Sequence, residues 1–168
     1  ANAIDPGIGG LLLLDALQPA GVAELRLDPY GVISALGGMA YIEPAAMVQI
    51  LDGGGLVNLG TAICPLGRPK GTTAMEVSVK VAGGQSFRRN VNAGFVQTVE
   101  IPAGQRAQVN IKVGPGLSLN GKNQLTLTVE GGAVGLILDG RGRPFAPPSS
   151  VDRRAQIIPR WYSAVRSK

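Results

Sequence analysis

The sequence predicts an α+β fold, namely a mainly antiparallel β sandwich or partly closed barrel with an N-terminal helical hairpin and a C-terminal helical segment. Two changes of periodicity predict it. Apolar residues recur three or four apart over residues 32–51, alternate with polar residues between Leu56 and Leu138, and return to helical spacing after residue 149. A chain of 168 residues with 45% hydrophobic and 16% charged residues can bury a core, so we expect a single α+β domain over residues 1–168.

The N-terminal helical hairpin is predicted from residues 32–51. Its first helix is expected over residues 32–41, although Gly37 and Gly38 each weaken a helix by about 1 kcal/mol relative to alanine. Pro44 suits the first position of a second helix, which Gly53–Gly55 should end. We expect the apolar faces of this hairpin to form core and to hold no cofactor.

Three segments of the middle region alternate between apolar and polar residues, as strands do when one face lies in a core and the other in water. They cover residues 75–81, 107–113 and 125–129. Asn120–Gly121, between the last two, is a strong turn signal. Val134–Leu138 is instead apolar at every position except glycine, so we expect a strand that is buried on both faces, in the interior of the sheet system.

The C-terminal segment is expected to close the domain as a helix. Ser149 and Asp152 are spaced as in a capping box at its start. Pro159 should kink this helix or split it in two, because proline lacks the N–H that a helix interior requires. Trp161 lies beside the apolar stripe of the helix and is expected to anchor it on the sheet.

The predicted interior strand runs directly into a charged loop. The strand ends on Asp139, and Arg141 and Arg143 follow it, separated by glycines. This loop is therefore the expected partner-facing or structure-locking centre of the domain. Two interpretations stay open. The arginines bind a partner or an anion outside the domain, or at least one of them pairs with Asp139 or caps a helix C-terminus inside it. The cost of burying an unpaired carboxylate favours the second interpretation.

A second basic turn of the form Gly-Arg-Pro carries Arg68 and Lys70. It lacks the spacing and the Lys-Ser/Thr ending of a phosphate loop, so it does not indicate nucleotide binding. Guanidinium groups and free backbone amides at either turn would suit an anion. The candidate partner- or anion-binding residues are Arg68, Lys70, Asp139, Arg141 and Arg143.

The net charge of +5 comes from the C-terminal end. Residues 1–140 carry 9 basic and 10 acidic side chains, whereas residues 141–168 carry 7 basic and 1 acidic. Aromatic residues do not interleave with these charges as they do in single-strand binders, so we expect no nucleic-acid partner but a solvated basic face or an acidic protein partner. No apolar run approaches the roughly 18 residues of a membrane span, so we expect no membrane partner.

Side chains that carry catalysis or bind metals are scarce. The chain has no histidine and a single cysteine, Cys64, in an apolar context. A nucleophile therefore lacks its usual base, and the acidic residues are scattered singly, so we expect no metal, no other cofactor and no enzymatic activity of this domain. Cys64 is expected to be a buried, inert thiol. A cysteine that can form no internal disulfide fits a reducing compartment, which predicts a cytoplasmic protein.

Five segments spread over most of the chain resemble one known family. They are Leu11–Pro19, Leu27–Gly31 together with Leu36–Gly37, Leu59–Thr61, Pro65–Gly67 and Gly131–Pro144. In this order they are similar to the C-terminal region of the MutL-type accessory proteins of cobalamin-dependent glutamate mutase, which are unrelated to the mismatch-repair protein of the same name. One position departs from the family's pattern, since Gly140 stands where the closing motif has alanine, which loosens the loop.

The resemblance implies a function. The chain would be the non-catalytic C-terminal domain of a longer accessory protein, and a start without Met or a signal-peptide pattern fits such a fragment. The upstream part would be an ATPase of the sugar kinase and heat-shock type. The whole protein would assist the assembly or reactivation of a cobalamin-dependent mutase, its expected protein partner, with this domain as a contact or moving domain. The alternative is an independent binding module for an anionic small molecule or acidic protein partner. The oligomeric state is left open.

Overall fold

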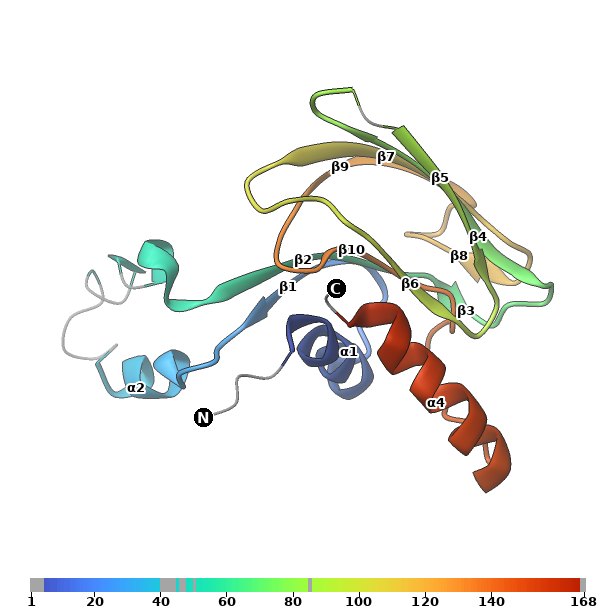
Figure 1. Cartoon of the computed structure of the whole chain (residues 1–168), viewed down its shortest axis with the longest axis horizontal. Helices are drawn as coiled ribbons and strands as arrows, with labels where there is room; N and C mark the ends of the chain where they lie inside the picture. The colour runs from blue at the N-terminus through green and yellow to red at the C-terminus, as the bar shows by residue number, and fades with distance from the viewer. Residues whose placement is uncertain (1–4, 40–44, 46–47, 50, 85, 167–168) are drawn as a thin grey trace.

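The structure, a computed structural model, describes residues 5–39, 45, 48–49, 51–84 and 86–166. Two four-stranded sheets face each other, and two helices cover the outer face of one of them (Figure 1). The fold is α+β with mainly antiparallel strands, which confirms the predicted class. Neither sheet closes on itself, so the open sandwich describes the molecule better than a barrel.

The first sheet has the order β1-β2-β10-β6 and holds a fully buried strand in its interior. Its members are β1 (Gly21–Leu27), β2 (Val57–Cys64), β10 (Gly135–Asp139) and β6 (Val96–Val99). β10 runs parallel to β2 and antiparallel to β6, and each of its residues is buried. The predicted interior strand at Val134–Leu138 is thereby confirmed, shifted by one residue.

The second sheet has the order β5-β4-β7-β9 and is antiparallel throughout. Its members are β5 (Ser86–Asn92), β4 (Thr73–Val81), β7 (Arg106–Val113) and β9 (Gln124–Glu130). Residues of β4 and β7 alternate between buried and exposed positions, as their sequence alternates between apolar and polar side chains. The three strands predicted from this alternation are confirmed.

A small two-stranded sheet joins β3 (Leu66–Gly67) to β8 (Leu117–Ser118). The turn predicted at Asn120–Gly121 follows it and is confirmed. Leu119 and Lys122 pair across this turn, and its two central residues have positive φ angles of 51° and 75°. Such angles define the two-residue hairpin turn that Asn-Gly favours.

The sandwich has two hydrophobic layers, and β10 contributes to both. Leu136 and Leu138 pack between the two sheets, whereas Ile137 faces the helices on the other side of the first sheet. Successive side chains of a strand point to opposite faces, so Asp139 follows Ile137 onto the helix-facing side. The strand therefore delivers a carboxylate into the layer beneath the helices.

The first helix, α1 (Pro6–Leu17), lies on the first sheet and was not predicted from periodicity. The side chain of Asp5 caps it by accepting a hydrogen bond from the backbone N of Ile8 at 3.1 Å. Its glycines weaken the helical pattern but permit close packing, because a Cβ on Gly7 would collide with the backbone carbonyl of Val165.

The C-terminal helix, α4 (Val151–Val165), packs on the first sheet at β6 as predicted, with Trp161 buried, and it also lies beside α1. The predicted cap was wrong by one residue, since the N-cap is Ser150 rather than Ser149. Of the two outcomes expected at Pro159, the split is wrong, because the helix continues through it as one element. Pro159 and Ala155 are both exposed, so the carbonyl that proline leaves without a helical N–H donor can reach water.

The first helix of the predicted hairpin is confirmed as α2 (Val32–Met39), and the described residues 45, 48 and 49 of its second helix are also helical. Pro44, the proposed start of the second helix, lies outside the described residues. The π-helical turn η1 (Leu51–Gly55) passes through the glycines that were expected to end that helix. The expectation that this region forms core is wrong for Ile33, whose exposed fraction is 56%, because α2 projects away from the two sheets (Figure 1).

Candidate functional site

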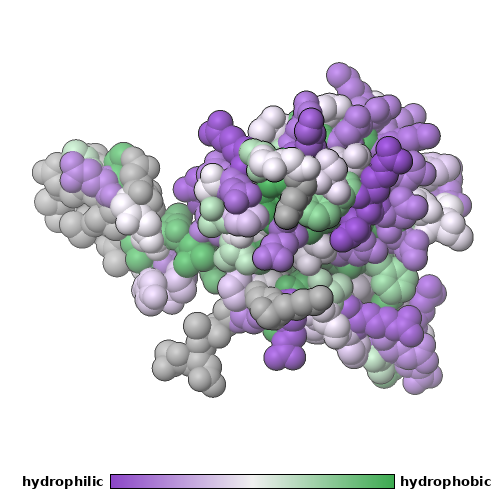
Figure 2. Space-filling model, turned by 45° about the horizontal axis from the view of Figure 1, so that its top comes forward, coloured by the Kyte–Doolittle hydropathy of each residue, from purple (hydrophilic) through white to green (hydrophobic). Residues whose placement is uncertain are grey.

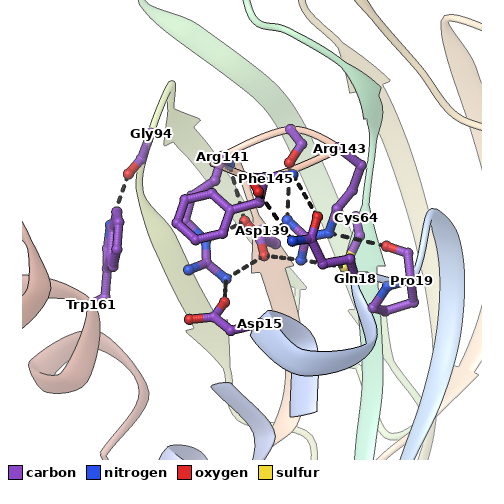
Figure 3. Close-up of polar contacts among 11 residues, drawn as sticks. Asp15, Gln18, Pro19, Cys64, Gly94, Asp139, Arg141, Arg143, Phe145 and Trp161 are labelled. Carbon is purple, nitrogen blue, oxygen red and sulfur yellow. Dashed lines mark hydrogen bonds and ion pairs between the residues drawn. The ribbon is translucent and has the colours of Figure 1, made fainter. Parts of the chain in front are cut away.

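The loop after β10 folds back on the end of the strand and forms what we call the charged cluster. It consists of Asp15, Asp139, Arg141 and Arg143, which lie together beneath the helix layer (Figure 3). The side chains of Asp139, Arg141 and Arg143 are 0–1% exposed, and that of Asp15 is 36% exposed. A candidate site that the sequence places on a loop is thus an interior structure.

Both carboxylate oxygens of Asp139 accept two hydrogen bonds. The Oδ1 atom accepts from the backbone N of Arg141 at 3.0 Å and from its Nε at 2.9 Å. The Oδ2 atom accepts from Nη2 of Arg141 at 2.8 Å and from Nη2 of Arg143 at 2.6 Å. With four charge-assisted or backbone donors, this carboxylate has no acceptor site left for an external group.

Arg141 joins three elements of the fold. Its Nη2 lies 2.7 Å from Oδ1 of Asp15 on α1, and its side chain makes the fork with Asp139 at the end of β10. The guanidinium carbon lies 4.3 Å from the ring centre of Phe145 and 4.9 Å from that of Trp161 on α4. Its Nη1 has no hydrogen-bond partner within the described residues. The contacts of the guanidinium group with these two rings therefore compensate for the burial of Nη1.

Arg143 is held from four directions. Besides its bond to Asp139, its Nε donates to the carbonyl of Pro19 at 3.2 Å and its Nη1 to that of Gly142 at 3.0 Å. Its Nη2 also lies 3.8 Å from Sγ of Cys64. A guanidinium group with these contacts ties the loop to the segment between α1 and β1.

The charges of the cluster balance, because two carboxylates face two guanidinium groups. Burial by itself raises the pKa of Asp139, but the hydrogen bonds and charges of Arg141 and Arg143 outweigh it and hold that pKa below its ordinary value. Burial likewise lowers the pKa of Arg141, and the bonds to Asp139 and Asp15 reverse this and raise it. Asp139 and Arg141 are therefore both ionised at neutral pH.

Cys64 borders the cluster and is buried. Burial is the main reason why the pKa of its thiol rises to about 12, and the negative charge of Asp139 adds to this effect. A thiol with such a pKa is neutral at physiological pH and a poor nucleophile. Its predicted burial is confirmed.

Of the candidate residues, the structure brings Asp139, Arg141 and Arg143 together and leaves Arg68 and Lys70 outside the cluster, both exposed. The expected pairing of an arginine with Asp139 is confirmed, and both arginines take part. The two Gly-Arg-Pro turns nevertheless lie side by side. Backbone N–H groups of Gly67 and Arg143 donate to each other's carbonyls at 2.8 and 3.1 Å.

Three residues of this centre were missed from the sequence: Asp15, Phe145 and Trp161, the last of which was predicted only as an anchor. A clue existed for Asp15, because it lies four residues after the buried Leu11 and therefore shares its helix face. An acidic residue on the buried face of a helix indicates a basic partner in the core.

Within the described residues, no group of three His, Cys, Asp or Glu side chains is placed to hold a metal ion, and no helix is long and apolar enough to cross a membrane. No family model, no curated protein and no solved structure matches this chain. The geometry of the charged cluster therefore has to be interpreted by itself. Its charge-balanced contacts lock β10, α1 and α4 together.

Proposed function

We propose that this chain is a non-catalytic contact domain of a cytoplasmic accessory protein that assists a cobalamin-dependent mutase. The resemblance of five segments to the MutL-type family supports the accessory role and the mutase partner. The closed charged cluster supports the non-catalytic role, because its buried charged side chains hold one another and offer no reactive group to a substrate.

The observation that carries the contact role is an apolar arm between β1 and β2, here residues 28–57. Among residues 29–57 only Glu43 and Asp52 are charged. Two of its described side chains, Tyr30 and Ile33, are 85% and 56% exposed. The arm leaves the body on one side, and hydrophobic residues are visible where it emerges (Figure 2).

The start of the arm is structurally fixed although its side chains are exposed. The carboxylate of Asp28 accepts hydrogen bonds from the backbone N of Val32 and of Ile33, both at 2.8 Å, and so caps α2. When a partner covers an exposed apolar surface on a fixed helix, the removal of that surface from water contributes about 25 cal/mol of favourable free energy for each Å². The arm therefore presents a ready contact surface, away from the charged cluster.

The alternative is an independent binding module for an anionic small molecule or acidic protein partner. It loses its support at Arg141 and Arg143, because Asp15 and Asp139 already neutralise both guanidinium groups, whereas Arg68 and Lys70 are exposed. The non-catalytic proposal predicts that the chain shows no saturable, Mg-dependent ATP binding at micromolar concentration by titration calorimetry. Such binding would overturn it.

The contact proposal is tested by biolayer interferometry between the chain and a purified cobalamin-dependent glutamate mutase. Ile33→Asp should weaken binding by about tenfold or more without changing the melting temperature, since Ile33 is exposed. Val151→Asp is the matched control, because Val151 is 68% exposed at the start of α4, far from the arm in sequence. Absence of binding by the unaltered chain would refute the mutase partner, and equal binding by Ile33→Asp would refute the arm.

A further inference from the structure

The outer face of the second sheet carries two adjoining hollows of about 740 and 570 Å³. Their linings share Glu76 and Lys112, so they form one shallow depression over β4 and β7. Hydrophilic residues dominate the upper right of the body in Figure 2, where this sheet comes forward. We call the depression the basic groove, lined by Ser78, Arg88, Arg89, Asn90, Asn110 and Lys112.

Sheet register explains why these side chains meet. Ser78 lies opposite Arg88 on one side and Asn110 on the other. In the next row, Glu76 lies between Asn90 and Lys112. Neighbouring strands are about 4.8 Å apart, so each row presents polar groups at a regular spacing across the sheet.

The basic groove has unpaired positive charge. On the outer face it contains Arg88 and Lys112 against the single acid Glu76, whereas Arg89, at its edge, pairs with the buried Val77 and places its guanidinium 6.0 Å from the ring centre of Phe87. No acidic side chain of the described residues forms an ion pair with these cations. Arg89 is partly positioned, since its Nη1 donates to the carbonyl of Arg88 at 3.1 Å. In the charged cluster, by contrast, every carboxylate and guanidinium group faces a group of opposite charge.

The side chains that line the basic groove favour one class of anionic ligand over others. Among the residues that the structure describes, no aromatic side chain lines the hollows, so this surface has no platform on which bases or sugar rings would stack. Guanidinium groups pair with carboxylates through two parallel hydrogen bonds, and asparagine and serine side chains can bond to a peptide backbone. We propose that the basic groove binds an acidic, extended peptide segment of a protein partner. This site is separate from the apolar arm and does not depend on it.

Fluorescence anisotropy tests the proposal with the full chain and a labelled Glu-rich peptide in a Gly-Ser background, at low ionic strength. The same peptide with glutamine in place of glutamate serves as the ligand control. The double variant Arg88→Gln/Lys112→Gln should lose affinity for the Glu-rich peptide by about tenfold or more. Both side chains are exposed, so the melting temperature should stay unchanged and report intact folding.

The matched protein control is Arg153→Gln/Arg160→Gln, which removes the same charge from exposed positions of α4. It should retain affinity, because the groove and not the net charge binds the peptide. Equal loss in both double variants, or equal binding of the glutamine peptide, would overturn the proposal. Tighter binding of a single-stranded oligonucleotide in competition would overturn it in favour of nucleic acid. None of these outcomes bears on the mutase contact of the apolar arm, which Ile33→Asp tests separately.

Discussion

Nη2 of Arg143 lies 2.6 Å from Oδ2 of Asp139, and neither side chain reaches solvent beyond 1% of its surface. The same oxygen also accepts a hydrogen bond from Arg141. One carboxylate at the end of a buried strand thus compensates two buried guanidinium groups. Because desolvated charges are costly when they lose a partner, this residue is the point at which the fold is most sensitive to a change of charge.

Asp139→Asn should lower the free energy of unfolding by about 3–5 kcal/mol, since it leaves buried guanidinium groups without their main counter-charge. Urea denaturation measures this loss. Glu100→Gln is the matched control, because it removes a carboxylate from an exposed position and should change stability by less than about 0.5 kcal/mol. A loss below about 1 kcal/mol for Asp139→Asn would contradict the locking role of the cluster.

The contribution of Asp139 should depend on pH with a defined sign. Its pKa in the folded chain lies below the ordinary value of 3.8, because the two arginines outweigh the effect of burial. The unfolded chain therefore binds the proton first as the pH falls. The stability difference between the unaltered chain and Asp139→Asn should be complete above about pH 5 and shrink as the pH falls below about 4. A difference that stays constant down to about pH 2 would contradict this assignment.

Trp161→Ala should cost about 3–5 kcal/mol of stability, because the indole is 4% exposed and packs edge-on against Phe145 at 5.4 Å. Its Nε1 also donates to the carbonyl of Gly94 at 2.8 Å. Trp161→Phe keeps an aromatic ring but leaves this carbonyl unsatisfied, so it should cost about 1–3 kcal/mol. Thermal and chemical unfolding check both values. A cost below about 1 kcal/mol for the alanine variant would show that α4 is peripheral.

Gly60→Ala should destabilise the chain by about 3 kcal/mol or more. Gly60 has a φ of 118°, and a Cβ there would collide with the backbone carbonyl of Gly135 on the neighbouring strand β10. Gly71→Ala is the matched control, since nothing lies within 4 Å of its added Cβ. Circular dichroism and denaturation of the two variants should therefore differ sharply, and similar stabilities would be inconsistent with the close pairing of β2 and β10.

Cys64 should resist thiol reagents in the folded chain. Burial raises its pKa to about 12, so at pH near 8 it is neither ionised nor accessible. Labelling in native buffer should be at least about a hundredfold slower than in concentrated guanidinium chloride. Equal rates in the two solutions would mean that the layer beneath the helices opens readily.

Elements whose pattern is local were predictable. Neighbouring residues alone show the alternation in β4, β7 and β9 and the uninterrupted apolar run of β10. The structure confirms these strands. The strand β1 was missed although Ala23, Leu25 and Leu27 alternate with Glu24 and Arg26, because this alternation is only five residues long. The helix α1 was missed because glycine has a low helix propensity. Its Gly7 instead allows the helix to approach α4 closely.

The sequence by itself determined that a carboxylate would end a strand buried on both faces and would need a basic partner nearby. Only the tertiary structure decided that both arginines turn inward. Their other partners, Asp15, Pro19 and Trp161, belong to the two ends of the chain, and Pro19 lies 124 residues from Arg143. A local sequence pattern cannot predict such contacts, because they form only when α1 and α4 pack on the same face of the first sheet.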